Sequence, residues 1–339
     1  MTEDAPADAL LLTEADLRPL TVDAGSIDGA IDAVEQATLA LHRGAATQAT
    51  FLGHPQASGR PSARVSFATA GGIATGVRVF GTPAPDNLGL VHTTNSRYYL
   101  LSDVETGQLL ALMDFVRLNA LRVGAIGGLA ARHLAPPGAR TLAVVGSGQQ
   151  ARTQVQAVCR AVPSIERVRV YSPTPAHREA FAEEMATWLG VKCEAMSSVA
   201  GATRDADVVD LATSSTTPVI ERAHVKPGAL VISMTDNQLP AEFVDTARAV
   251  FITWEAVAEN VFPRQPYTSR IAAGTFTRAD LGAARVGVVA DEVAPRRTAD
   301  DVVVFDLTAF SIHDLAVARW AYDWARANGV GTPFVLSRG

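Results

Sequence analysis

Short apolar runs alternate with amphipathic segments through the middle and later parts of the chain. Thr141–Val145 is apolar enough for a buried strand, and residues 150–162 after it have helical spacing. The pattern repeats with a strand at 168–171 and a helix that begins at Pro175 and ends at Gly190. Further strands are expected at residues 191–195, 208–213, 230–234, 250–253 and 302–307. This alternation predicts a doubly wound parallel sheet of the α/β class.

The first third of the chain has a different pattern. Apolar residues at helical spacing predict a helix within the first forty residues, capped by Ser26. After residue 49, short extended runs separated by Gly, Pro and Asn predict strands at 63–69, 76–80 and 97–101. The DVETGQ turn predicts a hairpin between the last of these strands and residues 109–113.

Two longer helices are expected on either side of the alternating region. Val116–Leu134 has helical character and is rich in small residues that permit close packing. The last helix is expected from Ser311 to Asn328, where Ser311 and Asp314 resemble a capping box and His313 faces solvent. Together the patterns predict two domains: a Rossmann domain at residues 122–309, inserted into an α+β domain made of residues 1–121 and 310–339.

Composition narrows the class of protein. The 339 residues are 48% hydrophobic and 19% charged, with a net charge of −6 and no Lys/Arg cluster, so no nucleic-acid partner is expected. No run approaches the roughly 18 apolar residues of a membrane span, and the acidic N-terminus does not resemble a signal peptide. Neither the two cysteines nor the seven histidines have metal-ligand spacing. A cytoplasmic, globular enzyme without a metal is expected.

A glycine-rich turn follows the first strand of the alternating region. The pattern G-x-G-x-x-A lies between an apolar strand and a helix, which is the context of a dinucleotide-binding turn. Two glycines permit a tight turn and close approach of a pyrophosphate, and the helix N-terminus presents N–H groups to the anion. The alternative is an ordinary strand-to-helix turn. The candidate cofactor-binding residues are Gly146, Ser147, Gly148, Gln149, Gln150 and Ala151.

The end of the second strand bears on the choice of cofactor. NAD-binding domains usually place Asp or Glu there to bind the ribose hydroxyls, and this chain has none between residues 171 and 178. The hydroxyls of Ser172 and Thr174 with the cation of Arg178 suit a 2′-phosphate, so NADP(H) is favoured over NAD(H). Alternatively, the two hydroxyls only cap the next helix and Arg178 is solvated.

Several segments resemble the ornithine cyclodeaminase/mu-crystallin family. They are residues 100–114 (LLSDVETGQLLALMD), 118–125 (LNALRVGA), GSGQQA at 146–151, ATSS at 212–215, MTD at 234–236 and IHDL at 312–315. The resemblance implies a homodimer that uses NAD(H) or NADP(H) to deaminate amino acids oxidatively or to reduce cyclic imines. It also implies that the first third and the C-terminal helix form a substrate and dimerisation domain.

The resemblance assigns roles to individual residues. Arg122 matches the family arginine that binds the substrate carboxylate, and Asp236 matches the acid near the nicotinamide. Thr94 is a candidate for the substrate site. Alternatively, Arg122 lies on a helix surface and Asp236 in a solvated turn. Three residues after another strand are further candidates for the dinucleotide site: Thr213, Ser214 and Ser215.

Arg78 departs from the family pattern, which has lysine at this position. The family lysine contacts the substrate carboxylate and exchanges protons, whereas an arginine keeps its charge and cannot act as a base. Arg78 is therefore expected to bind or polarise the substrate, while Asp236, a water or another side chain transfers protons. A second family arginine has only Arg60 and Arg64 as candidates.

Three functions remain open from the sequence. The first is an NADP(H)-preferring oxidoreductase that acts on the C–N bond of a small α-imino or α-amino acid. The second is an ammonia lyase of the ornithine cyclodeaminase type with bound NAD. The third is a dinucleotide-binding, crystallin-like protein without catalysis, which the replacement of the family lysine by Arg78 would permit.

Overall fold

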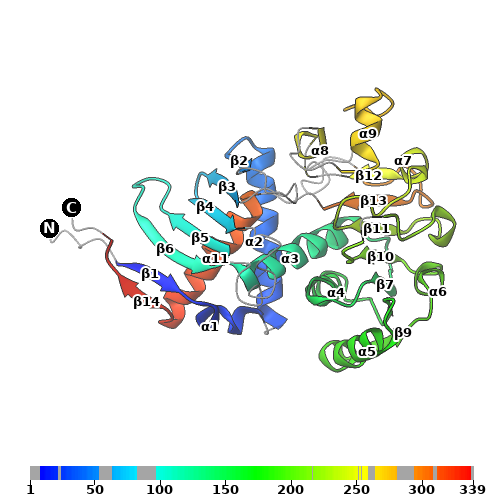
Figure 1. Ribbon diagram of the computed structural model, residues 1–339, viewed down its shortest axis with the longest axis horizontal. Helices are drawn as coiled ribbons and strands as arrows, with labels where there is room; N and C mark the ends of the chain where they lie inside the picture. Colours follow the sequence, from blue (N-terminus) through cyan, green and yellow to red (C-terminus); the bar gives the residue numbers. More distant parts are fainter. Residues whose placement is uncertain are drawn as a thin grey trace, which may run out of the picture. The chain divides into compact units, whose positions relative to one another are not determined.

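A computed structural model describes residues 8–21, 24–52, 63–81, 97–215, 217–250, 252, 254–258, 264–280, 294–307 and 311–336. The chain divides into two compact units (Figure 1). The first unit combines Met1–Arg122 with Phe310–Gly339, and the second unit is Val123–Ala309. The helix α3 (Val116–Leu134) begins in the first unit and continues into the second.

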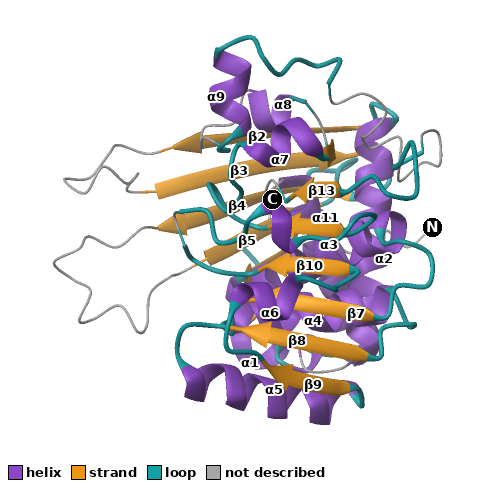
Figure 2. Cartoon of the chain, turned by 90° about the vertical axis from the view of Figure 1, so that its right-hand side faces the viewer, coloured by secondary structure: helices purple, strands orange, loops and turns teal. Residues whose placement is uncertain are grey.

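The described part of the second unit contains a seven-stranded parallel sheet (Figure 2). In spatial order its strands are β12 (Arg248–Val250), β13 (Val303–Asp306), β11 (Leu230–Ser233), β10 (Val208–Leu211), β7 (Thr141–Val145), β8 (Arg167–Tyr171) and β9 (Lys192–Ala195). The chain runs from β7 outward through β8 and β9, then returns to the other side of β7 at β10. This reversal of direction is the switch point of a doubly wound sheet, so the predicted Rossmann-type α/β fold is confirmed.

Helices cover both faces of the parallel sheet. Helices α4 (Gln149–Ala161) and α5 (Pro175–Leu189) lie on one face, and the short α6 (Val199–Thr203) lies on the other (Figure 1). Pro175 occupies the first turn of α5, and Gly190 ends it with a left-handed φ of 67°, as the sequence predicts. The remaining helices of this unit are η3 (Arg222–His224), α7 (Glu242–Thr246), α8 (Glu255–Ala258) and α9 (Tyr267–Ala272).

Alternation along the strands decides what the core of the second unit contains. Val209 and Leu211 of β10 point into an apolar cluster with Val145, Val231 and Phe243. Asp210 lies between them and therefore faces the opposite side of the sheet, where it is completely buried.

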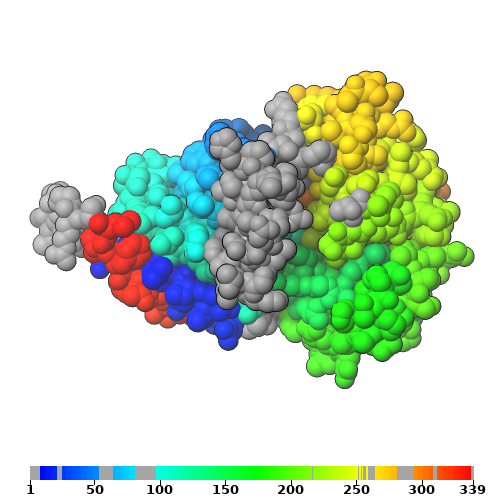
Figure 3. Space-filling model, in the orientation of Figure 1, coloured from blue at the N-terminus to red at the C-terminus, as the bar shows by residue number. Residues whose placement is uncertain are grey.

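The first unit contains a mixed sheet of seven described strands. In spatial order they are β14 (Thr332–Phe334), β1 (Ala9–Leu12), β6 (Leu109–Asp114), β5 (Arg97–Ser102), β4 (Ala74–Gly81), β3 (Ala63–Ala70) and β2 (Ala46–Leu52). Only the pair of β1 and β6 is parallel among these strands. The hairpin of β5 and β6 is confirmed. The N-terminal and C-terminal strands adjoin, as the blue and red atoms in Figure 3 show.

One face of this mixed sheet is covered by helices. Helix α11 (Ser311–Asn328) packs on β2, β3, β4 and β5, and α2 (Ala24–His42) packs against α11. The first unit also contains α1 (Glu14–Leu17), capped by a Thr13–Asp16 capping box, and the turn η1 (Pro19–Thr21). No helix among the described residues is long and apolar enough to cross a membrane.

The structure corrects several sequence-based expectations. The first forty residues include the strand β1, and Ser26 lies inside α2 instead of capping it. The strand expected at 250–253 is β12, two residues earlier. β1 and β14 are short, and their partners lie far away in the sequence, so local periodicity carries little signal for them.

Candidate active site

The turn after β7 has backbone geometry that only glycine can provide. Gly146 has a φ of +126°, and a Cβ atom placed on it would lie 2.0 Å from the carbonyl oxygen of Ala212, which follows β10. A larger residue would push apart the two strands at the switch point of the sheet. Gly146 N–H donates to the Tyr171 carbonyl at the end of β8, which ties the turn to the next strand.

The N-terminus of α4 is shaped to receive an anion. Gly148 is the N-cap residue, and no side chain caps the first N–H groups of this helix. A Cβ on Gly148 would meet nothing within 4 Å, so the space beside this residue is open. Gln149, Gln150 and Ala151 form the first turn. The residues therefore fit a dinucleotide pyrophosphate, which such helix N-termini bind through backbone N–H groups and the helix dipole.

Small residues of α3 allow it to approach α4 closely, as the sequence predicts. A Cβ on Gly124 would lie 2.7 Å from the Thr153 carbonyl oxygen, and one on Gly127 would lie 1.7 Å from Oε1 of Gln154. Gln154 is fully buried, and its Nε2 donates to the Val123 carbonyl at 3.2 Å. These contacts fix the direction of α4, and with it the direction of the N–H groups at its start.

The residues proposed for cofactor choice form one small network after β8. Ser147 Oγ donates to Ser172 Oγ at 3.0 Å, which joins the phosphate turn to the end of the second strand. Arg178 is half-buried, and its Nη1 donates to the Ser172 carbonyl at 2.9 Å. Thr174 is the exposed N-cap of α5, but its side chain makes no capping hydrogen bond. The hydroxyl of Thr174 therefore does not have the purely capping role of the alternative interpretation.

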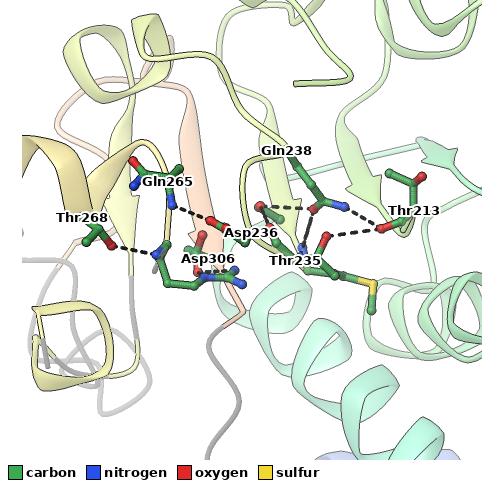
Figure 4. A network of polar contacts seen from close by, with 10 residues as sticks. Thr213, Thr235, Asp236, Gln238, Gln265, Thr268 and Asp306 are labelled. Carbon is green, nitrogen blue, oxygen red and sulfur yellow. Dashed lines mark hydrogen bonds and ion pairs between the residues drawn. The ribbon is translucent and has the colours of Figure 1, made fainter. Parts of the chain in front are cut away.

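Gln238 organises the loops that follow β10 and β11 (Figure 4). Its Oε1 accepts hydrogen bonds from the backbone N–H groups of Met234 at 2.9 Å and Thr235 at 3.1 Å. Its Nε2 donates to the Thr213 carbonyl at 3.0 Å. Gln238 is completely buried, so one amide side chain holds both loops at the carboxyl end of the sheet, where doubly wound folds bind ligands. Sequence reasoning missed Gln238.

Asp236 lies beside Gln238 in the loop after β11 and is exposed. Its Oδ1 accepts a hydrogen bond from the Gln265 backbone N–H at 2.6 Å, so one carboxylate oxygen is held in place (Figure 4). Ser214 is exposed, whereas Thr213 and Ser215 are half-buried, and Thr213 Oγ1 accepts from the Ser215 N–H at 3.2 Å.

A buried ion pair lies close to Asp236. Arg264 Nε donates to Asp306 Oδ1 at 2.8 Å, and both side chains are almost completely buried. Burial raises the pKa of Asp306, the Arg264 cation opposes that shift, and the charge of Asp236 adds to it. Asp306 is the last residue of the otherwise apolar strand β13, and the sequence of this strand gave no indication of an ion pair.

The first unit contains a buried cluster of two arginines around one carboxylate. Asp314 Oδ2 lies 2.9 Å from Arg78 Nη1, and Asp314 Oδ1 lies 2.8 Å from Arg122 Nε. Asn119 Oδ1 accepts from Arg122 Nη2 at 2.8 Å and from Arg78 Nη1 at 3.3 Å. The side chain of Asp314 is 1% exposed, and those of Arg78 and Arg122 are 9% and 3% exposed. Arg122 is therefore not a helix-surface residue.

This cluster corrects two expectations about the start of α11. Asp314 binds the two arginines and does not act as a capping residue, and Ser311 Oγ instead lies 3.5 Å from the Ala49 carbonyl. His313 is completely buried and not solvated; its Nε2 lies 3.0 Å from Thr38 Oγ1. Burial lowers the pKa of His313 to about 3, with a smaller contribution from Arg122, so it is neutral at physiological pH.

Not every candidate falls within the described residues. Thr94 and Arg60 lie outside them. Arg64 lies on β3 and is half-buried, and burial followed by the Arg78 charge lowers its pKa to about 10. Among the described residues, no group of three or more His, Cys, Asp or Glu side chains is arranged to hold a metal.

These features define a Rossmann-type protein with a glycine-rich turn after β7 and a buried arginine cluster in its other unit. The family model for the ornithine cyclodeaminase/mu-crystallin family matches residues 22–329, and the chain belongs to this family.

Two relatives with named activities match most of the chain. The chain is 30% identical over 283 residues to a Delta(1)-pyrroline-2-carboxylate reductase of Bacillus cereus, covering 82% of this chain and 86% of that protein. It is 32% identical over 234 residues to the iminosuccinate reductase of Paracoccus denitrificans, covering 68% of this chain and 71% of the relative.

A solved structure also matches nearly the whole chain. The Delta(1)-pyrroline-2-carboxylate reductase of Thermococcus litoralis, in complex with NADH and L-proline, has a TM-score of 0.82 and 27% sequence identity. The match covers 96% of this chain and 100% of that one. The similarity therefore extends over both units and not over the Rossmann domain alone.

Proposed function

We propose that this protein is an NAD(P)H-dependent oxidoreductase that reduces the C=N bond of a small α-imino acid, or oxidises the corresponding amino acid. The observation that carries the proposal is the turn after β7. There Gly146 allows the turn to approach Ala212 after β10, and the space beside Gly148 at the uncapped start of α4 is open. Two relatives named as imine reductases support the reaction type. In this proposal the second unit binds the dinucleotide and the first unit binds the substrate.

The cofactor is held mainly by the backbone in this account. The residues from Gly146 to Ala151 bind the pyrophosphate, and Thr213, Ser214 and Ser215 line the dinucleotide after β10. When bound, the reduced nicotinamide supplies the hydride. Gln238 fixes the loops after β10 and β11 through three hydrogen bonds, so these loops present their side chains without reorganising.

The substrate carboxylate is bound by Arg122 and Arg78. Arg122 Nη1 and Arg78 Nε are buried and have no hydrogen-bond partner among the described residues. Buried donors without acceptors are costly, and a substrate carboxylate would satisfy them. Asp314 contacts both guanidinium groups and so fixes their orientation. Thr94 is proposed to line the same site.

Asp236 is proposed to transfer the proton to or from the substrate nitrogen. Arg78 cannot do so, because a guanidinium group does not lose its proton in a protein. The hydrogen bond from Gln265 N–H holds one oxygen of the Asp236 carboxylate in place. The exposed position of this carboxylate lets it exchange protons with solvent between turnovers.

NADP(H) is the cofactor that we propose the protein prefers over NAD(H). The end of β8 has no acidic residue to bind the ribose hydroxyls, and Arg178 is anchored there by its bond to the Ser172 carbonyl. A guanidinium group next to the exposed Thr174 hydroxyl suits a 2′-phosphate. The ratio of the two dissociation constants, measured by calorimetry, tests this preference.

A homodimer is proposed from the outer face of the mixed sheet. The helices α2 and α11 cover the inner face, whereas Leu11, Tyr98 and Leu100 on the outer face are 39%, 49% and 38% exposed. Val77 and Val79 extend this apolar surface across β4. A sheet that is apolar on both faces indicates a second covering layer, and a second copy of the chain would supply it. Sedimentation of the wild type and of Leu100→Glu tests the dimer.

We further propose that the protein is cytoplasmic.

The activity is tested by following nicotinamide absorbance with Delta(1)-pyrroline-2-carboxylate and NADPH or NADH. The proposal expects net consumption of the reduced cofactor. Asp236→Asn should lower kcat about 100-fold while cofactor affinity stays within about twofold. Asp245→Asn, an exposed carboxylate of the same unit paired with Arg270, is the matched control and should not change kcat. Ammonia release from ornithine without net change of cofactor would contradict the proposal.

A further inference from the structure

Two arginines from neighbouring strands contact one aromatic ring on the inner face of the mixed sheet. Arg64 on β3 pairs with Phe80 on β4, and Phe80 pairs with Arg97 on β5, so the three residues form one row across three strands. The guanidinium carbons of Arg64 and Arg97 lie 6.0 Å and 5.0 Å from the centre of the Phe80 ring. Both distances are within cation–π range, so the Phe80 ring favours keeping the two cations near it.

The next row of the same sheet face contains Arg78. Ser66, Arg78 and Tyr99 pair across the same three strands, two residues along from the row of Phe80. Because side chains two residues apart on a strand share one face, Arg64 and Arg97 lie beside Arg78. Consistent with this arrangement, the charge of Arg78 is, after burial, the largest cause that lowers the pKa of both Arg64 and Arg97.

Positive charge exceeds negative charge among the described groups here. The four guanidinium groups of Arg64, Arg78, Arg97 and Arg122 face two carboxylates, Asp314 and Asp114. Asp314 is already bound to Arg78 and Arg122, and Asp114 accepts a hydrogen bond from the Val116 N–H. Four guanidinium groups gathered in this part of the first unit create a positive potential that favours an anionic ligand.

We propose that Arg64 and Arg97, which both contact Phe80, form a second anion subsite, and that the substrate is an α-imino dicarboxylate. This inference rests on the proposed function. The buried pair Arg78 and Arg122 binds the carboxylate next to the imine carbon. The half-buried pair Arg64 and Arg97 binds the distal carboxylate, and its partial exposure leaves it accessible to that group. Hydride goes to the imine carbon and a proton to the nitrogen, which gives an amino dicarboxylate and the oxidised cofactor.

The test compares two imines that differ by one carboxylate. They form in solution from oxaloacetate or from pyruvate with excess ammonium, and the full chain reduces them with NADPH or NADH. The dicarboxylic imine should have the higher kcat/KM by at least about tenfold, the value of one charged hydrogen-bonding contact. Arg97→Gln should lower this ratio at least about tenfold, mainly through KM, and Arg97→Lys should retain part of it.

The matched control is Arg319→Gln, a half-buried arginine of the same unit that pairs with Asp323 on α11, outside this cluster. It should leave the ratio within about twofold. A preference for the monocarboxylic imine would overturn the subsite. So would equal losses for both imines in Arg97→Gln, because a purely structural arginine would affect both alike.

Failure of the proposed function gives a different result. If neither imine nor pyrroline-2-carboxylate is reduced, calorimetry with malate and lactate tests the subsite by itself. Tighter binding of malate that is lost in Arg97→Gln supports the subsite, and equal binding of the two acids overturns it.

Discussion

The two sites proposed to bind anions in this protein are built from different parts of the chain. In the turn after β7, backbone N–H groups at the start of α4 face the ligand, and glycines provide the space. In the cluster around Asp314, long side chains from β4, α3 and α11 meet in a buried place. The comparison teaches that a backbone site depends on which side chains are absent, whereas a side-chain site depends on the partners that hold its charges.

The largest effect is expected at Gly146. Gly146→Ala places a Cβ 2.0 Å from the Ala212 carbonyl oxygen on a backbone with φ of +126°. We expect destabilisation of about 3 kcal/mol or more by urea unfolding, together with loss of dinucleotide binding. Gly148→Ala is the companion variant. Because nothing lies within 4 Å of its new Cβ, stability should change by less than about 1 kcal/mol, while the methyl group weakens pyrophosphate binding. Equal stability losses in both variants would contradict this account of the turn.

The second test removes the charge that holds the side-chain site together. Asp314→Asn leaves Arg78 and Arg122 buried without their carboxylate, so the free energy of unfolding should fall by about 3–5 kcal/mol. Asp323→Asn, which removes the exposed partner of Arg319 on the same helix, should cost less than about 1 kcal/mol. A small loss in Asp314→Asn would mean that the two arginines do not depend on this carboxylate.

The third test concerns Asp210, a carboxyl group that neither backbone N–H groups nor side chains hydrogen-bond among the described residues. It is completely buried in β10, and neither oxygen has a hydrogen-bond partner among the described residues. Burial raises the pKa of Asp210 from 3.8 to about 8. Between these two values the unfolded chain loses the proton and the folded chain retains it, so stability falls as pH rises and the full penalty is present above pH 8.

Asp210→Val should remove this penalty. The variant is expected to be more stable than the wild type by about 3 kcal/mol near pH 8, an order-of-magnitude figure, and to lose that advantage towards pH 4. Urea unfolding of both proteins across this range measures the difference. A constant difference at all pH values would show that Asp210 does not titrate as burial dictates.

The smallest effect is expected at the end of β8. Arg178→Gln removes the cation proposed for the 2′-phosphate, so the affinity for NADPH should fall about tenfold while that for NADH stays within about twofold. Calorimetric titration with both nucleotides measures the change. Arg169→Gln, at a half-buried arginine within β8 itself, is the control for a general loss of positive charge. Equal losses for NADPH and NADH in Arg178→Gln would contradict the role of Arg178.

The contrast between the two sites also explains how much the sequence could predict. The glycine-rich turn lies in one short segment, so the spacing of Gly146 and Gly148 after an apolar strand was sufficient to propose it as the phosphate site. The seven described strands of the second unit and the helices α4 and α5 were predicted with small shifts, because βα units are local. The short helices α6, α7, α8 and α9 were not predicted. Asp314 is remote from Arg78 and Arg122 in the sequence, and its spacing from Ser311 suggested a helix cap instead.

Gln238 had no sequence signal of its own, and the sequence signal of Asp210 was incomplete. Gln238 is an ordinary loop residue until the folded chain places it against Thr213 and Met234. Asp210 interrupts an otherwise apolar strand, which marks it as unusual, but the absence of a partner among the described residues becomes visible only in the sheet. Contacts between distant segments are the part that one sequence does not contain.

The most direct test of the central claim is calorimetric titration of the full chain with NADPH and with NADH. The account predicts saturable binding of at least one of them at one site per chain, abolished in Gly146→Ala and weakened in Gly148→Ala. If neither nucleotide, reduced or oxidised, releases or absorbs heat with the folded protein, the turn after β7 does not bind a dinucleotide and the proposed redox function is wrong.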